Sequence, residues 1–252
     1  MLKILLSGCN GKMGRVITNL FLEQSAFKIT AGFDAVDIHS NAYPVYKSLS
    51  ECKIDIDVII DFSNACVLEP LLEFALFRKI PIVIATTGHS EEQIHKIEQA
   101  SRIIPIFRSA NMSLGINLVA EFVEKAAKVL GDSFDIEIIE KHHNQKVDSP
   151  SGTALMLADL INSAVSEPKQ YVFDRHSIHE KRKSNEIGIH SVRGGTIVGE
   201  HSTIFAGKDE IIEINHSALS RNVFGKGALA AVNFIYNQKP GLYSMKDIIK
   251  GY

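Results

Sequence analysis

The densest group of residues that could do chemistry lies between Glu140 and Thr153, where two histidines, Lys146 and a predicted helix start fall within fourteen residues. A histidine near its ordinary pKa exchanges protons at pH 7. A lysine such as Lys146 adds a fixed cation, or an acid if its pKa is lowered. These groups suit reduction of a C=N or conjugated C=C bond, which consumes a proton as well as a hydride. The segment therefore predicts a proton-donating site.

The end of this segment, Ser151 to Thr153, opens a predicted helix. Hydroxyls, unpaired backbone N–H groups and the positive end of the helix dipole are suited to holding a carboxylate. Two other interpretations of the adjacent His142 and His143 stay open. They could bind a metal, although neighbouring side chains on a strand point to opposite faces and no third ligand is evident. At least one of them could also be structural.

A second group of residues predicts a nucleotide site. Gly8, Gly11 and Gly14 form G-x-x-G-x-x-G directly after the first predicted strand, where glycine lets the backbone approach a pyrophosphate. A purely structural turn would look the same. Asp34 lies twenty residues after Gly14, at the end of the second predicted strand, where a carboxylate accepts hydrogen bonds from ribose hydroxyls. The combination predicts dinucleotide binding.

The residues after Asp34 bear on the choice of dinucleotide. They are Ala35 and Val36, so no arginine or lysine stands ready to pair with a 2'-phosphate. This predicts a weak preference for NADH, although Lys12 in the glycine turn could help to bind NADPH. The loops 85–88 and 109–112 also follow strand-like segments, so they are candidates to hold the nicotinamide end. Ordinary turns with Ser, Thr and Asn caps are the alternative.

The elements that must position these groups differ between the two parts of the chain. In the first hundred residues, apolar strand-like runs alternate with helical patterns, which is typical of a parallel, doubly wound, Rossmann-like sheet. These strands are expected at 3–7, 28–33, 57–62 and 80–85.

The second part of the chain has a different pattern. A helix over 114–130 carries apolar residues at helical spacing: Leu114, Leu118, Phe122, Val123, Ala126 and Val129. Strands are then expected at 135–140, 187–192, 203–205 and 211–215, with a helix at 153–165, which indicates an α+β domain. The polar, basic segment 166–186 is interpreted as a solvated loop. A last helix, 225–236, could pack back on the first domain.

Composition limits the possible partners and location. The chain has 252 residues and a formal net charge of −2, so it lacks the basic surface that nucleic acid requires. Its three cysteines have no metal-type spacing, and no apolar stretch reaches the length of a membrane span. We therefore expect a cytoplasmic protein with a small-molecule partner, no membrane contact and no resident metal.

The segment 140–153 closely resembles the signature of the dihydrodipicolinate reductase family, and the similarity runs over nearly the whole chain. It extends to the glycine turn, 61–63, 85–88, 109–113, 191–195 and 198–201. The chain departs modestly from the family pattern, with Lys141 where a small residue is more usual and Thr196 where an acid is common. The glycine turn is shared by many dehydrogenases, whereas the segment from His142 to Thr153 is distinctive.

The resemblance implies roles for individual residues. His142 is implied to donate a proton with Lys146 as its cationic partner, while His143, Gly152 and Thr153 hold a cyclic dicarboxylate substrate. The residues implied to contact the cofactor are Gly8, Cys9, Asn10, Gly11, Lys12, Met13, Asp34, Ala85, Thr86, Thr87, Ser109, Ala110, Asn111 and Met112.

The resemblance also implies an activity and an architecture. The activity is NADH- or NADPH-dependent reduction of 4-hydroxy-tetrahydrodipicolinate to tetrahydrodipicolinate, with loss of water, in lysine and diaminopimelate biosynthesis. The implied fold is a Rossmann domain, 1–113 plus 222–252, with an inserted α+β domain, 114–221, for substrate binding and homotetramer formation. Two alternatives are another Rossmann-fold dehydrogenase of a small anionic metabolite and a non-catalytic protein that senses NADH.

Overall fold

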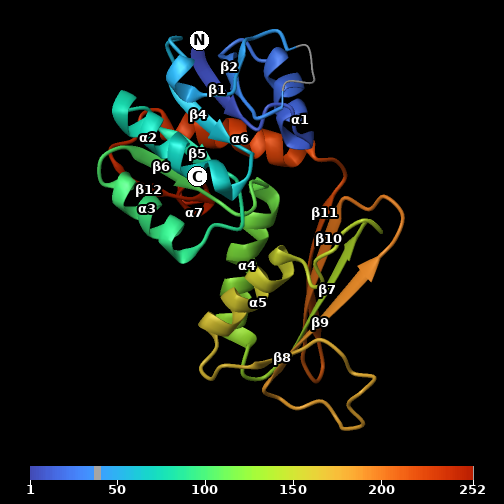
Figure 1. The fold of residues 1–252 in the computed structure, drawn as a ribbon. Coiled ribbons are helices and arrows are strands. Elements are labelled where there is room, and N and C mark those ends of the chain that lie inside the picture. The colour runs from blue at the N-terminus through green and yellow to red at the C-terminus, as the bar shows by residue number, and fades with distance from the viewer. Residues whose placement is uncertain (37–40, 252) are drawn as a thin grey trace. The chain divides into compact units, whose positions relative to one another are not determined.

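The structure is a computed structural model that describes residues 1–36 and 41–251. By its internal contacts the chain divides into two compact units, which Figure 1 shows in one view. Unit 1 consists of Met1–Leu114 and Arg221–Tyr252, and unit 2 is Gly115–Ser220. Unit 1 is therefore built from two stretches of chain.

Unit 1 is organised around a seven-stranded sheet in which every neighbouring pair is parallel. Its strands, in spatial order, are β12 (Gly241–Tyr243), β6 (Pro105–Arg108), β5 (Ile82–Ile84), β4 (Val58–Asp61), β1 (Leu2–Ser7), β2 (Phe27–Phe33) and β3 (Val45–Tyr46). The order reverses direction beside β1, and the carboxyl ends of the strands at such a point form the usual ligand crevice of an open α/β sheet.

Helices cover both faces of this sheet, and the alternation of side chains along β1 shows it. Leu6 packs in one apolar cluster with residues of α1, α6 and α7, whereas Leu5 packs in another with residues of α2 and α3. The helices are α1 (Lys12–Leu22), α2 (Leu68–Arg78), α3 (Glu91–Ser101), α6 (Asn222–Ile235) and α7 (Met245–Ile249), with short 3-10 turns at Leu49–Glu51 and Ala65–Val67. The predicted doubly wound parallel sheet is confirmed.

Unit 2 contains a mixed five-stranded sheet. Its strands, in spatial order, are β11 (Ile211–Ala218), β10 (Gly199–Ala206), β7 (Asp135–His142), β9 (Glu186–Arg193) and β8 (Gln170–Val172). β10 is antiparallel to β7 and β11, whereas β9 is parallel to β7 and β8. Helices α4 (Leu114–Leu130) and α5 (Gly152–Ala164) pack on one face in a single apolar cluster. The predicted α+β character of this part is confirmed.

The apolar face of α4 differs from the one that the sequence suggested. Its buried residues are Ile116, Ala120, Val123 and Ala127, whereas Leu118, Phe122 and Val129 are exposed. The small side chains let the helix lie close to the sheet, and a count of large apolar residues overlooks them. Within the described residues, no helix is long and apolar enough to cross a membrane.

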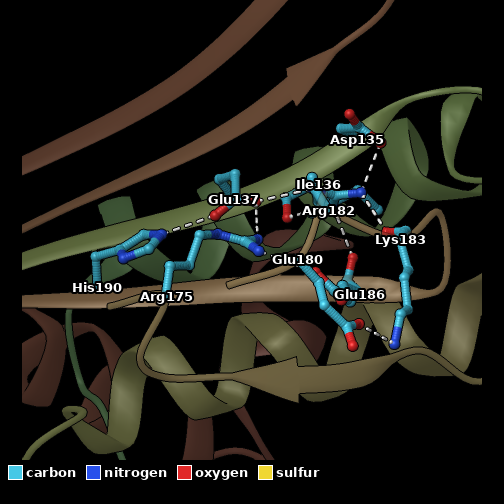
Figure 2. A network of polar contacts seen from close by, with 9 residues as sticks. All are labelled: Asp135, Ile136, Glu137, Arg175, Glu180, Arg182, Lys183, Glu186 and His190. Carbon is cyan, nitrogen blue, oxygen red and sulfur yellow. Dashed lines mark hydrogen bonds and ion pairs between the residues drawn. The ribbon is translucent and has the colours of Figure 1, made fainter. Parts of the chain in front are cut away.

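The basic segment before β9 is also different from its sequence interpretation. Arg182 donates to Glu137 at 3.0 Å and to Asp135 at 2.6 Å, and Arg175 binds both Glu137 and Glu186. Figure 2 shows these side chains converging on Glu137. The interpretation as a solvated loop is therefore wrong for these arginines. Asp135 and Glu137 of β7, which are distant in the sequence, hold them together with the nearby Glu186 of β9.

Candidate active site

A cavity of about 560 Å³ lies in unit 1 at the carboxyl ends of β1, β2 and β4. Its lining includes the turn after β1, the residues after β2 and a cation just beyond β3. The lining residues are Ser7, Gly8, Asn10, Gly11, Phe33, Asp34, Ala35, Val36, Lys47, Phe62, Ser63, Asn64, Cys66 and Val67. Four of the residues predicted to contact a cofactor, Gly8, Asn10, Gly11 and Asp34, are among them.

The glycine turn is shaped by close backbone contacts. Gly8 has a φ of 75°, and a Cβ there would lie 2.5 Å from the carbonyl oxygen of Phe62. A Cβ on Gly14 would run into the carbonyl oxygens of Gly8 and Cys9. Asp34 accepts hydrogen bonds from the backbone N–H groups of Asn10 and Val36, at 2.9 and 3.1 Å. The acid thus braces the turn while it lines the cavity.

Lys47 is a cation at this cavity that the sequence analysis overlooked. Ala35 and Val36 are apolar as stated, but the backbone N–H of Asp34 donates to the carbonyl of Tyr46 at 3.1 Å, so Lys47 follows alongside. Its side chain is exposed, and it makes no hydrogen bond or ion pair with any part of the chain that the structure describes. The expectation that no lysine is available for a 2'-phosphate was therefore incomplete.

The other predicted cofactor residues lie outside this lining. Cys9 is fully buried in the apolar cluster beneath α6 and Met112 is in the same cluster, whereas Lys12 is exposed. Thr86, two residues after β5, accepts a 2.9 Å hydrogen bond from the backbone N–H of Ser63, which lines the cavity.

The remaining ones, Met13, Ala85, Thr87, Ser109, Ala110 and Asn111, also belong to unit 1. Ser109 donates to the carbonyl of Asn111 at 2.8 Å, and Asn111 in turn caps Ser113 at 2.9 Å. Their predicted contacts with a cofactor stay predictions.

The predicted proton-donating site lies in unit 2, at the end of β7. Glu140 and His142 are two residues apart on a strand, so both point to the face that α5 covers. Nδ1 of His142 and Oε2 of Glu140 are 2.5 Å apart. Burial lowers the pKa of His142, and the Glu140 carboxylate opposes this effect by favouring the charged ring.

Glu140 is the most heavily bonded side chain of this site. Arg193 of β9 reaches both of its oxygens, at 2.7 and 2.8 Å, and the backbone N–H of Ser151 donates to Oε1 at 3.1 Å. Burial alone would raise the pKa of Glu140, but hydrogen bonds from Arg193, Ser191 and His142 lower it to about 2. The carboxylate is therefore charged at neutral pH although its side chain is completely buried.

His201 of β10 forms the neighbouring wall of the site. Its ring lies edge-on to the His142 ring with centroids 5.2 Å apart, and its Nε2 is 3.0 Å from Oγ of Ser151. Burial, and then the nearby His142, lower the pKa of His201 to about 4. At neutral pH His201 is therefore uncharged.

The other predicted substrate residues lie around this core. Lys146 pairs with Asp148 at 2.8 Å, and its backbone N–H donates to the carbonyl of His143. Gly152 and Thr153 form the first turn of α5, after Ser151, whose side chain accepts from the N–H of Ala154. A Cβ on Gly152 would have no neighbour within 4 Å, so the helix start is open. Among the described residues, no three His, Cys, Asp or Glu side chains are grouped to hold a metal ion.

Sequence reasoning gave no role to Glu140, Arg193 or His201, although all three stood in quoted motifs. The spacing of Glu140 and His142 was a usable signal, because residues two apart on a strand share a face. Arg193 and His201 belong to β9 and β10, so only the pairing of strands brings them to β7.

The chain matches one known protein family along nearly its whole length. Residues 2–112 match the family model described as dihydrodipicolinate reductase, N-terminus, and residues 115–249 match dihydrodipicolinate reductase, C-terminus. A 4-hydroxy-tetrahydrodipicolinate reductase of Caldanaerobacter subterraneus is 56% identical over 99% of both chains. One of Clostridium novyi is 48% identical, also over 99% of each.

Solved structures agree with this result. A dipicolinate-bound dihydrodipicolinate reductase from Paenisporosarcina superposes with a TM-score of 0.84 and 25% identity, covering 98% of this chain and 99% of that one. A probable dehydrogenase from Thermotoga maritima, at 10% identity and a TM-score of 0.62, covers 98% of this chain and 92% of its own, and it shares the fold alone. With both family models matched along nearly its whole length, the chain belongs to the dihydrodipicolinate reductase family and is an oxidoreductase.

Proposed function

We propose that this chain reduces 4-hydroxy-tetrahydrodipicolinate to tetrahydrodipicolinate, with loss of water, in lysine and diaminopimelate biosynthesis. The names of its full-length relatives support this activity. The structural observation that carries it is the Glu140–His142 pair beside the first turn of α5, which combines a proton donor with an anion site. The overall reaction consumes one hydride and one proton and releases the hydroxyl as water.

The residues of unit 2 divide this work among themselves. His142 delivers the proton from Nε2, because its Nδ1 is engaged by Glu140. The cationic Lys146 lies on the loop that follows β7 and draws the dicarboxylate to the site. His143, Gly152 and Thr153 bind the substrate, with the positive end of the α5 helix dipole facing a carboxylate.

A reduced nicotinamide cofactor supplies the hydride when it is bound, and unit 1 is the proposed site for it. The cavity at the glycine turn fits a dinucleotide, because Gly8 keeps the backbone free of side chains and Asp34 offers carboxylate oxygens to a ribose. We propose that NADH is weakly preferred, since Asp34 repels a 2'-phosphate. Lys47 reduces that repulsion enough for NADPH to bind as well.

We further propose that unit 2 is the substrate-binding and tetramer-forming domain of a cytoplasmic homotetramer. The helices of its apolar cluster cover one face of the sheet, and the other face carries the Glu137 network. No disulfide joins the three cysteines, all of which lie in the described part of the chain, and this agrees with a reducing compartment. Sedimentation velocity of the purified protein tests the tetramer directly, and cell fractionation tests the location.

The activity is tested by following NADH and NADPH oxidation in the presence of a synthase that makes the unstable substrate from pyruvate and aspartate semialdehyde. We expect oxidation that depends on the synthase, faster with NADH than with NADPH. Folded protein that binds NADH but oxidises neither cofactor under these conditions would contradict the proposed substrate and the roles of His142 and Lys146.

A further inference from the structure

The Glu140 carboxylate joins two parts of the proposed reaction that the sequence presents as separate motifs. Oε2 contacts Nδ1 of His142, the proposed proton donor, and Oε1 accepts from the backbone N–H of Ser151, which caps the helix that holds the substrate. Arg193 grips both oxygens. One buried side chain thus contacts both the proposed proton donor and the start of the helix that is proposed to hold the substrate.

The contacts of His142 determine which ring nitrogen is left to deliver a proton. With Nδ1 bound to a carboxylate, the neutral ring keeps its proton on Nδ1, and the second proton of the charged ring resides on Nε2. Nε2 faces Gly199 of β10, where an added Cβ would lie only 3.1 Å away. The absence of a side chain at position 199 leaves Nε2 uncrowded.

Arg193 keeps Glu140 in the form that this arrangement needs. A planar guanidinium that binds both carboxylate oxygens favours the charged carboxylate and fixes its plane. The NH2 group of Arg193 also donates to the carbonyl of Asp148 at 2.7 Å, which ties the loop between β7 and α5 to the same group. Glu140 therefore accepts hydrogen bonds and does not take the proton from His142.

Charged or titratable side chains from four parts of unit 2 lie near the His142 ring. Glu140 lies on its own strand, Arg193 on β9, His201 on β10 and Lys146 on the following loop. Lys146 and Arg193 disfavour the charged ring, and Glu140 is the group that favours it. If the negative charge of Glu140 is removed, the remaining effects of burial, Lys146 and Arg193 all lower the pKa of His142.

We propose that Glu140 is the positioning residue of the reaction: it presents His142 with Nε2 as the proton-delivering atom and anchors the start of α5, while Arg193 holds the carboxylate in place. This inference rests on the proposed function for the identity of the reaction. The contacts that carry it all lie within unit 2.

The main test is Glu140→Gln, which keeps the size of the side chain and removes its charge. We expect kcat to fall about 10²-fold, the scale of a misplaced catalytic group, and KM for the substrate to rise. The fall of kcat toward high pH should move to lower pH, because a proton donor with a lowered pKa loses its proton earlier. NADH affinity, a property of unit 1, should stay at the parent value.

A second readout does not depend on activity. In an NMR titration, with the His142 signal assigned by its absence in His142→Gln, we expect the pKa of this ring to be lower in Glu140→Gln than in the parent. Glu200→Gln is the matched control, because Glu200 pairs with Lys141 on the opposite face of the sheet. It should leave kcat and the titration unchanged.

The outcomes separate this inference from the proposed function. Parent values of kcat, KM and the His142 pKa in Glu140→Gln would overturn it, even in an active enzyme. If the parent shows no reductase activity, the titration alone decides whether Glu140 controls His142. If Glu140→Gln does not fold, Arg193→Lys replaces it, with an expected drop in kcat of about 10-fold through loss of the two-oxygen grip. An unchanged Arg193→Lys would then refute the inference.

Discussion

The carboxylate of Asp34 accepts a 2.9 Å hydrogen bond from the backbone N–H of Asn10, so the acid at the end of β2 holds the turn that follows β1. Its other oxygen accepts from Val36. Each carboxylate oxygen has a second lone pair, which leaves room for a ribose hydroxyl. The residue therefore serves both the shape of the cavity and the proposed binding of a cofactor.

Replacement of Asp34 by alanine should weaken NADH binding about 10- to 100-fold, because hydrogen bonds to a charged group are worth about 1.5–3 kcal/mol. Asp34→Asn keeps acceptors for the turn but loses the charge, so a smaller loss is expected. A fluorescence titration with NADH measures both. Unchanged affinity in Asp34→Ala would contradict the assignment of the ribose site.

Lys47 predicts a separable effect on the phosphorylated cofactor. Lys47→Ala should weaken NADPH binding about 5-fold, the scale of an exposed ion pair of about 1 kcal/mol, and leave NADH binding unchanged. Titration with 2',5'-ADP and ADP gives the same comparison without turnover. Lys12→Ala is the control, because Lys12 is exposed and outside the cavity lining. An effect in Lys12→Ala alone would assign the 2'-phosphate to the glycine turn instead.

The proposed proton donor and its cation should affect turnover and not cofactor binding. His142→Gln and Lys146→Ala are each expected to lower kcat about 10²-fold or more, the usual contribution of general acid catalysis. Both residues lie in unit 2, so the affinity for NADH should stay within error of the parent. Parent turnover in both variants would remove these residues from the mechanism.

Gly14 predicts a stability effect that arises from backbone crowding. In Gly14→Ala the new Cβ meets the carbonyl oxygens of Gly8 and Cys9, which cannot move aside as side chains do. We expect a loss of about 1–3 kcal/mol and a Tm lower by several degrees. Gly194→Ala has no neighbour within 4 Å of the new Cβ and serves as the control. Equal Tm values for the two variants would be evidence against a tightly packed turn.

The carboxylates of Glu140 and Glu137 should make the stability of the protein depend on pH. Burial raises the pKa of both carboxyl groups, but hydrogen bonds outweigh this effect. They lower the pKa of Glu140 from 4.5 to about 2. Hydrogen bonds from His190, Arg182 and Arg175 lower the pKa of Glu137. The unfolded chain binds these protons at a higher pH than the folded chain does. The stabilisation is therefore fully present above about pH 5 and is lost as pH falls through the folded pKa. For Glu140 it amounts to about 3 kcal/mol.

Denaturant unfolding of the parent between pH 6 and 3 should show this loss. Glu137→Gln should flatten part of the curve, because one of the two carboxylates no longer titrates. Asp209→Asn, at an exposed carboxylate in the turn between β10 and β11, is the matched control. A parent protein whose free energy of unfolding is constant over this range would disprove the coupling.

Much of the fold was predictable because its signals are local. Continuous apolar runs identified β1, β2, β4 and β5, since strands covered on both faces have no polar side to alternate with. The two-residue β3 was missed because a run that short has no periodicity, and with it the position of Lys47. The contacts of Glu140 were missed for a related reason, since Arg193 is 53 residues away and reaches it only through the pairing of β7 with β9.

Unit 1 is built from two separate stretches of chain, so it cannot be completed until the last residues have been synthesised. Helix α6 carries Ala228, Ala231, Val232 and Ile235 into the apolar cluster around Ile4, and it follows all of unit 2 in the chain. During synthesis, the residues of unit 2 therefore leave the ribosome before α6, which is the longest helix packed on one face of the unit 1 sheet. Unit 2 can bury its own apolar cluster during this interval. The face of β1 that α6 later covers stays exposed, and it is the surface that chaperones or neighbouring nascent chains would contact.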